Sequence, residues 1–216
     1  MAHSHIDAAP ATRGSVIHWA GHYDQLVSLL MLGRRRRLRA MTIALARIQP
    51  GEHVLEVGCG TGDVALAACA PSGPHGSVAG IDAGPEMIAV ARAKAARAGA
   101  TVDFRLEPIE ALTYPEATFD IVLSSLMMHH LPDDLKRQGM AEIARVLKPG
   151  GRLLIIDAKR PTTHLGRVFN TLMLHGKLTT AIQDLPAMLH EAGYVEIETG
   201  PTEFSMLGFV RAQTRK

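Results

Sequence analysis

The feature that most constrains this chain is a glycine turn that follows a short apolar segment. Residues 53–57 read His-Val-Leu-Glu-Val, residues 58–62 read Gly-Cys-Gly-Thr-Gly, and a helical stretch begins at Asp63. Glycines after a strand let the backbone approach a ligand closely and place N–H groups and a helix N-terminus beside it. The sequence therefore predicts an α/β fold that binds a nucleotide-like molecule at this turn.

Strands and helices alternate along the following chain. Strands are expected at 53–57, 77–81, 102–106, 119–123 and 152–156, helices at 63–70, 85–98 and 133–147, and a turn at 149–151. Such alternation favours a parallel sheet covered by helices on both faces. After a helix over 181–192, the β-rich segments 194–199 and 204–212 are separated only by Gly200-Pro201 and should form an antiparallel hairpin. The predicted fold is a doubly wound sheet of seven strands, mostly parallel.

The segment that precedes the first strand has a helical pattern. Apolar residues recur at helical spacing from Val16 to Ile48 with a break at Gly33, which predicts two helices or one kinked helix. We expect residues 1–48 to form N-terminal cap helices and residues 49–216 to form the ligand-binding domain, the two making one structural unit. The arginine run Arg34–Arg37, followed by Arg39, is expected to be a solvated helix face with one or two arginines directed inward, with contact to anionic lipid or an acidic substrate as the alternative.

Composition limits the class of partner. The 216 residues include 23 Lys+Arg and 21 Asp+Glu, and a net charge of +2 gives no field to hold a phosphate backbone, so no nucleic-acid partner is expected. The chain has no charged n-region followed by an apolar h-region, nor a window of about 18 uninterrupted apolar residues, so no membrane span is expected. The only two cysteines fit a reducing compartment. The predicted location is cytoplasmic.

An acidic residue ends the second expected strand. Asp82 stands where a carboxylate can accept hydrogen bonds from both ribose hydroxyls, as in dehydrogenases that bind NAD. The dinucleotide fingerprint is G-x-G-x-x-G, however, whereas residues 58–62 read G-x-G-x-G, and the chain has no Tyr-x-x-x-Lys. These departures count against an NAD(P)-dependent oxidoreductase, which is kept as an alternative.

Four segments together resemble a known family. Residues 54–62, Gly80-Ile81-Asp82, Phe119-Asp120-Ile121-Val122 and 147–151 are similar, in order and spacing, to the motifs of class I S-adenosylmethionine-dependent methyltransferases. Within that family, the Tyr23-Asp24 start, Met87-Ile88 and His129-His130-Leu131 look most like the ubiquinone/menaquinone C-methyltransferase group. The resemblance implies a Rossmann-like fold, S-adenosylmethionine as cofactor and a small molecule as methyl acceptor.

The resemblance also implies roles for individual residues. Glu56 would order the loop and lie near the methionine amino group, Asp82 would hold the ribose, and Ser124 would offer backbone contacts. The full set of cofactor-binding residues expected is Tyr23, Glu56, Gly58, Cys59, Gly60, Asp82, Ala83, Met87, Pro108, Ile109 and Ser124. One position departs from the family pattern, because Pro108 stands where many relatives carry Asp or Asn to bond the adenine amino group; Glu107 or a backbone carbonyl is expected to substitute.

Two adjacent histidines follow the fourth expected strand, at the sheet edge where ligands of open α/β folds bind. His129 is the candidate general base, and His130 is either a second catalytic residue or a hydrogen-bonded residue at a helix entry. Adjacent imidazoles rarely share an ion, so no metal site is expected. Candidate substrate-lining residues from the cap and from 159–180 are His18, Trp19, His22, Phe169, Met173 and His175, with Tyr23 beside them.

The sequence leaves several hypotheses open. The leading one is methyl transfer to a small, apolar or aromatic O-, C- or N-acceptor. The alternatives are the oxidoreductase, a non-catalytic protein that binds S-adenosylmethionine, and a methyltransferase that acts on a macromolecule, which the arginine run alone supports. The acceptor is not encoded in any motif, and either a monomer or a homodimer is compatible with the sequence.

Overall fold

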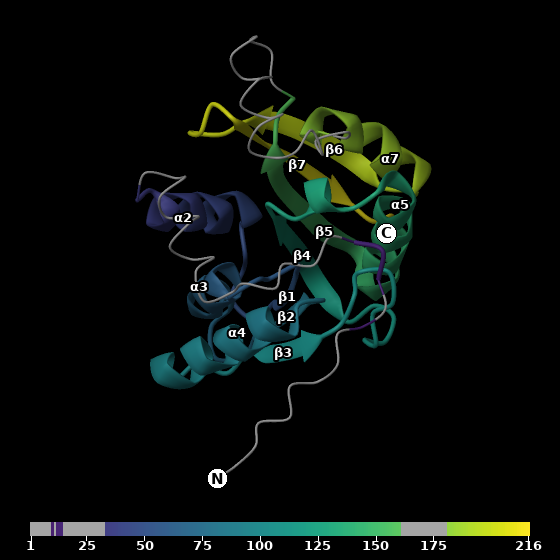
Figure 1. Ribbon diagram of the computed structural model, residues 1–216. Coiled ribbons are helices and arrows are strands. Elements are labelled where there is room, and N and C mark those ends of the chain that lie inside the picture. Colours follow the sequence, from purple (N-terminus) through teal and green to yellow (C-terminus); the bar gives the residue numbers. More distant parts are fainter. Residues whose placement is uncertain (1–9, 11, 15–32, 161–180) are drawn as a thin grey trace.

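A computed structural model describes residue 10 and residues 12–14, 33–160 and 181–216. These residues form one seven-stranded sheet in the order β3-β2-β1-β4-β5-β7-β6, flanked by helices (Figure 1). The strands are β1 (His53–Val57), β2 (Ser77–Asp82), β3 (Asp103–Leu106), β4 (Phe119–Ser125), β5 (Leu147–Ala158), β6 (Val195–Pro201) and β7 (Leu207–Gln213). The helices are α2 (Arg35–Ala46), α3 (Asp63–Ser72), α4 (Pro85–Ala98), α5 (Asp133–Val146) and α7 (Leu185–Glu191), with 3₁₀ turns η1 (Met128–His130) and η2 (Ile182–Asp184).

The direction of the strands confirms the predicted fold class. Strands β3, β2, β1, β4 and β5 run parallel, whereas β7 is antiparallel to both β5 and β6. The chain order reverses on either side of β1 and β4, because β2 and β3 lie on one side and β5 on the other. Ligands of open α/β sheets bind at such a switch point, beyond the carboxyl ends of the strands.

Both faces of the central strands β1 and β4 are buried, which explains why these strands read as nearly continuous apolar runs. In β1, Val54 packs with α2, α3 and α4 on one face, and Leu55 and Val57 pack with α5 and α7 on the other. Figure 1 shows α2, α3 and α4 gathered apart from α5 and α7. The alternating side-chain directions of the strands thus divide the core into two layers.

Some element boundaries differ from the sequence expectation. The predicted turn at 149–151 lies inside β5, where a register shift opposite Phe119–Ile121 accommodates the extra residues and Gly150 has a φ of +74°. The hairpin turn comes after Pro201 and not at Gly200-Pro201, since β6 is an edge strand and tolerates a residue without an N–H donor. The helix expected over 181–192 is a 3₁₀ turn followed by the shorter α7, with Pro186 in the first turn of α7.

The N-terminal prediction lies partly within the described residues. Gly33, with a φ of +72°, precedes α2 as the expected break, and α2 packs on the same core layer as α3. Residues 15–32 lie outside the described part, so the cap helices stay a prediction. In the described ranges 33–160 and 181–216, no helix is both long and apolar enough to cross a membrane.

Candidate active site

The glycine turn after β1 is shaped by backbone conformations that favour glycine. Gly58 and Gly60 have φ values of +66° and +52°, a region that side chains disfavour. A Cβ at Gly58 would overlap the side chain of Met127, whereas a Cβ at Gly60 would meet nothing within 4 Å. The Cys59 N–H donates to the Ile81 carbonyl at 2.8 Å and ties the turn to β2. Gly60 therefore faces open space that a ligand can approach.

Asp82, at the end of β2, is bonded to backbone on both oxygens. Its Oδ2 accepts a hydrogen bond from the Gly60 N–H and its Oδ1 accepts one from the Gly84 N–H, each at 2.8 Å. Burial raises the pKa of Asp82, and these two backbone bonds act in the opposite direction. Each carboxylate oxygen can accept a further bond, so hydroxyl groups of a ligand would stabilise a charge that burial disfavours.

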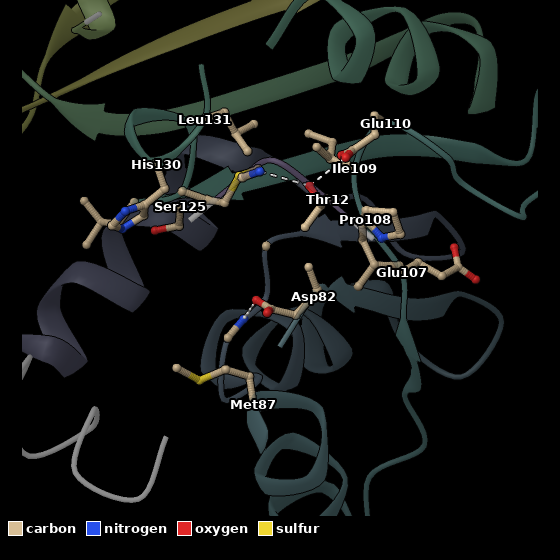
Figure 2. Close-up of a pocket in the computed structure, with 17 residues that line it drawn as sticks. Thr12, Asp82, Met87, Glu107, Pro108, Ile109, Glu110, Ser125, His130 and Leu131 are labelled. Atoms are coloured by element: carbon tan, nitrogen blue, oxygen red, sulfur yellow. Dashed lines mark hydrogen bonds between the residues drawn. The ribbon is translucent and has the colours of Figure 1, made fainter. Parts of the chain in front are cut away.

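A cavity opens beside Asp82 at the carboxyl ends of the strands (Figure 2). One end is formed by the loop after β3, with Glu107, Pro108, Ile109 and Glu110, and the other by Ser125 at the end of β4 and His130 in the turn that follows. The complete lining is Thr12, Gly14, Gly58, Gly60, Ile81, Asp82, Ala83, Met87, Glu107, Pro108, Ile109, Glu110, Ser125, Leu126, Met127, His130 and Leu131. The Asp82 carboxylate thus lies between two ends of the cavity that are formed by different segments of the chain.

A second cavity adjoins the first and shares Gly58, Gly60, Ser125 and Leu126 with it. Its other lining residues are Arg35, Leu38 and Arg39 from α2, and Glu56, Cys59, Thr61, Asp63 and Val64 from β1, the turn and the start of α3. Together the two cavities form a continuous site along the glycine turn.

Glu56 is the most deeply buried carboxylate of this second cavity. Its exposed fraction is 2%, and it accepts a hydrogen bond from the Ala65 N–H at 2.8 Å. Burial raises the pKa of Glu56 well above its ordinary value, and the nearby charges of Asp63 and Asp82 add to that effect. A cationic group of a ligand placed here would stabilise the ionised carboxylate.

The predicted histidine pair occupies η1, directly after β4. The His129 Nδ1 lies 2.6 Å from Asp157 Oδ1, and the His129 backbone N–H donates to Asp157 Oδ2 at 3.1 Å. Asp157 is a buried residue near the end of β5, so the histidine is anchored to the neighbouring strand. The rings of His129 and His130 are 4.0 Å apart between centroids, and His130 lines the first cavity.

Most predicted cofactor residues lie together. Gly58, Gly60, Asp82, Ala83, Met87, Pro108 and Ile109 line the first cavity, and Glu56 and Cys59 line the second. Ser124 is buried one residue away from the lining, which Ser125 forms instead, and His129 lines neither cavity among the described residues. The remaining predicted residues, His18, Trp19, His22, Tyr23, Phe169, Met173 and His175, lie outside the described ranges.

Sequence reasoning missed several residues of the site. Thr12, Glu110 and Met127 line the first cavity, and Asp157 holds His129 of the predicted histidine pair. Of these, only Asp157 has a signal in the sequence, since it is an acidic residue near the end of a buried strand. Within the residues that the structure describes, no group of three or more His, Cys, Asp or Glu side chains could hold a metal ion.

Comparisons with known proteins agree with this geometry. Residues 54–151 match the family model described as a methyltransferase domain. The ubiquinone/menaquinone biosynthesis C-methyltransferase UbiE of Geobacter sulfurreducens is 36% identical over 148 residues, which cover 68% of this chain and 57% of that protein. This chain therefore matches somewhat more than half the length of that curated relative.

Two solved structures share the fold. A SAM dependent methyltransferase from Aquifex aeolicus has a TM-score of 0.65 at 22% identity, covering 87% of this chain and 97% of that one. Phosphoethanolamine N-methyltransferase 2 from Haemonchus contortus, in complex with S-adenosyl-L-methionine, has a TM-score of 0.68 at 17% identity, covering 85% and 53%. At these identities the likeness concerns the fold.

Proposed function

This chain belongs to the class I S-adenosylmethionine-dependent methyltransferases, and from that membership we propose that it transfers a methyl group to a small molecule. The observation that carries the proposal is the pairing of Asp82 with the Gly60 N–H beside a cavity that Gly60 leaves open. A ribose fits that carboxylate, and the glycine turn gives the rest of a nucleoside close access to the backbone.

The described residues fit S-adenosylmethionine at three points. Asp82 can accept bonds from both ribose hydroxyls, Glu56 can face the amino group of the methionine part, and Ala83 and Met87 offer an apolar wall for the base. Buried carboxylates with raised pKa values, as at Glu56 and Asp82, favour a ligand that carries a positive charge. When bound, the cofactor supplies a methyl group activated by its sulfonium.

The chain's own contribution is to align an acceptor, exclude water and hold a proton. In our proposal His129 accepts the proton of the acceptor, and Asp157 orients the ring through Nδ1, which leaves Nε2 as the basic nitrogen. His130, which lines the cavity, contacts the bound ligands. This assignment rests on the carboxylate contact of His129 and on the place of η1 at the carboxyl edge of the sheet.

The acceptor is proposed to be a small apolar or aromatic molecule. Relatives named ubiquinone/menaquinone C-methyltransferases support an aromatic carbon acceptor of the quinone precursor type. The cap residues expected to line its site, among them Trp19 and Phe169, lie outside the described ranges. The proposed acceptor class therefore rests on the names of the relatives and on the apolar residues in the N-terminal segment and in residues 159–180. A monomer or a homodimer is proposed, with no nucleic-acid partner.

The test is calorimetry on the full chain. S-adenosylmethionine and its demethylated product should bind, and NAD and NADP should not, because the G-x-G-x-G turn lacks the spacing of a dinucleotide site. Asp82→Ala should weaken binding by about 1.5–3 kcal/mol for each charge-assisted ribose bond lost. Transfer of labelled methyl to a panel of hydroquinones and phenols separates an enzyme from a protein that only binds. Binding of NADH alone would overturn the proposal.

A further inference from the structure

The loop after β3 presents two carboxylates to the end of the first cavity that lies away from His130. Glu107 and Glu110 both line the cavity, and Pro108, which carries no side-chain acceptor, stands between them (Figure 2). The two carboxylates differ in what they already bind. That difference decides which of them can contact a ligand.

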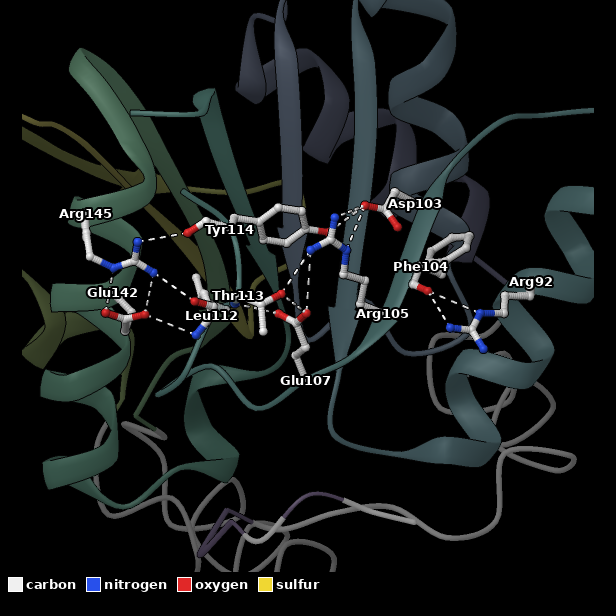
Figure 3. Close-up of polar contacts among 10 residues, drawn as sticks. All are labelled: Arg92, Asp103, Phe104, Arg105, Glu107, Leu112, Thr113, Tyr114, Glu142 and Arg145. Atoms are coloured by element: carbon white, nitrogen blue, oxygen red, sulfur yellow. Dashed lines mark hydrogen bonds and ion pairs between the residues drawn. The ribbon is translucent and has the colours of Figure 1, made fainter. Parts of the chain in front are cut away.

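The carboxylate of Glu107 already makes hydrogen bonds within its own loop. Its Oε2 accepts a hydrogen bond from the Thr113 N–H at 3.1 Å, its Oε1 accepts one from the Thr113 hydroxyl, and the Arg105 guanidinium lies 3.8 Å from Oε1 (Figure 3). Both oxygens and the charge of Glu107 are therefore used within the protein. Its role is to close the loop.

Glu110 has one oxygen engaged and one left over. Its Oε1 accepts a hydrogen bond from the Thr12 hydroxyl at 2.6 Å, whereas its Oε2 is buried without a hydrogen-bond partner among the described residues (Figure 2). A buried carboxylate oxygen that makes no hydrogen bond is costly, because it has lost water without gaining a donor. A ligand with a donor at this end of the cavity would satisfy it.

The position of Glu110 is fixed from both sides. The loop is turned by a hydrogen bond from the Ala111 N–H to the Pro108 carbonyl at 3.3 Å, and the Leu112 N–H donates to Glu142 of α5 at 3.1 Å. On the other side, the Thr12 hydroxyl that bonds Glu110 also accepts from the Gly14 N–H at 3.1 Å. The carboxylate is thus held by contacts that exist before any ligand arrives.

We propose that Glu110, held in place by Thr12, accepts a hydrogen bond from the exocyclic amino group of the cofactor's adenine and so selects an aminopurine. This inference rests on the proposed function, which places the ribose at Asp82 between the two ends of the cavity. With the methionine part directed to Glu56, the base lies toward the loop after β3, where Oε2 of Glu110 is the carboxylate oxygen without a partner.

The experiment compares two ligands that differ at one position of the base. S-adenosylhomocysteine carries a 6-amino donor, and S-inosylhomocysteine carries a 6-oxo acceptor in its place. Calorimetry on the full-length protein should give about tenfold or tighter binding of the adenosyl compound, since a hydrogen bond to a charged group is lost with the inosyl compound. Glu110→Ala should abolish that preference. Glu110→Gln should abolish or reverse it, because the amide can donate to the 6-oxo group.

Two further variants keep the result specific. Glu107→Gln lines the same cavity end and should lower thermal stability through its lost loop contacts while leaving the ratio of the two affinities unchanged. Thr12→Val should reduce the ratio, because Oε1 of Glu110 loses its donor. An unchanged ratio in Glu110→Gln, or a collapsed ratio in Glu107→Gln, would overturn the inference. A wild-type protein that binds neither compound would instead contradict the proposed function together with this assignment.

Discussion

The two sides of β4 build their parts of the site in different ways. On the side of β1 and β2, backbone groups do the positioning, as the Gly60 N–H holds Asp82 and the Cys59 N–H holds the turn against β2. On the side of β5, side chains do it, as Asp157 of β5 fixes His129 of η1. The first side can be specified by a short run of sequence, whereas the second depends on contacts between separate elements.

The difference predicts which property each side controls. Changes at the glycine turn should act on cofactor affinity, because the backbone there forms the surface that the cofactor approaches. Changes at His129 or Asp157 should act on turnover, because these side chains hold the proposed proton acceptor. Variants that separate affinity from turnover test this division.

The largest effect is expected at His129. His129→Ala should lower turnover by about a hundredfold or more, the range that general-base assistance contributes, while the affinity for S-adenosylhomocysteine stays nearly unchanged. Asp157→Asn should lower turnover in the same direction, because the amide no longer fixes the tautomer of the ring. Single-turnover kinetics and calorimetry measure the two quantities separately.

His130→Ala is the matched comparison for this pair. His130 lines the first cavity, whereas the residue whose Nδ1 lies 2.6 Å from Asp157 Oδ1 is His129, so the loss of His130 should change ligand affinity more than the rate of the chemical step. Normal turnover in His129→Ala would remove the base from the proposed mechanism. Equal losses of affinity and turnover in Asp157→Asn would show that the aspartate only supports the loop.

The second prediction uses two glycines with similar backbone conformations. Gly60 has a φ of +52° and lines both cavities, whereas Gly99 has a φ of +62° at the end of α4, and a Cβ at either position meets nothing within 4 Å. Gly60→Ala and Gly99→Ala should therefore lose similar stability, about 1–2 kcal/mol from the left-handed backbone. Only Gly60→Ala should also weaken binding of S-adenosylhomocysteine.

The expected loss of affinity in Gly60→Ala is about tenfold to a hundredfold, since an added methyl group in a fitted site costs about 1–3 kcal/mol. Chemical denaturation gives the stability of both variants, and calorimetry gives the affinity. Equal affinities in the two variants would mean that the cofactor does not approach Gly60. That result would contradict the expectation that changes at the glycine turn act on cofactor affinity.

The difference between the two sides of β4 also explains how much of the fold and of the candidate site could be predicted from the sequence. The strand β1, the turn, Asp82 and the doubly wound fold could be predicted because they depend on local patterns and on the short range between residues 53 and 82. The contacts of Thr12 with Glu110 and of His129 with Asp157 join residues 98 and 28 positions apart. No local pattern specifies such pairs, so the sequence suggested Glu107 or a backbone carbonyl as the substitute acceptor. Both side-chain oxygens of Glu107 already accept hydrogen bonds from Thr113 in its own loop.

The smallest expected effect concerns stability at Glu56. Burial raises the pKa of Glu56 in the folded protein above its ordinary value of 4.5, so the folded state favours the protonated form. Its contribution to stability is fully present below that ordinary value and is lost as the pH rises through the raised, folded-state pKa. In the absence of cofactor, Glu56 therefore contributes less to the stability of the folded protein at neutral pH than at acidic pH.

Glu56→Gln removes the ionisable carboxyl group and so tests whether it lowers the stability of the folded protein at neutral pH. The amide oxygen can still accept from the Ala65 N–H, so the melting temperature at pH 7.5 should rise by a few degrees, on the order of 2–4 °C, and the gain should vanish near pH 4. Asp63→Asn should instead lower the melting temperature at pH 7.5, because Asp63 pairs with Arg35 and Lys94.

Cofactor affinity should fall in Glu56→Gln, since the amino group of the methionine part loses its carboxylate. A stabilised variant with unchanged affinity would show that the methionine part lies elsewhere, and a variant less stable than wild type at pH 7.5 would show that the bond to Ala65 outweighs the cost of the buried charge.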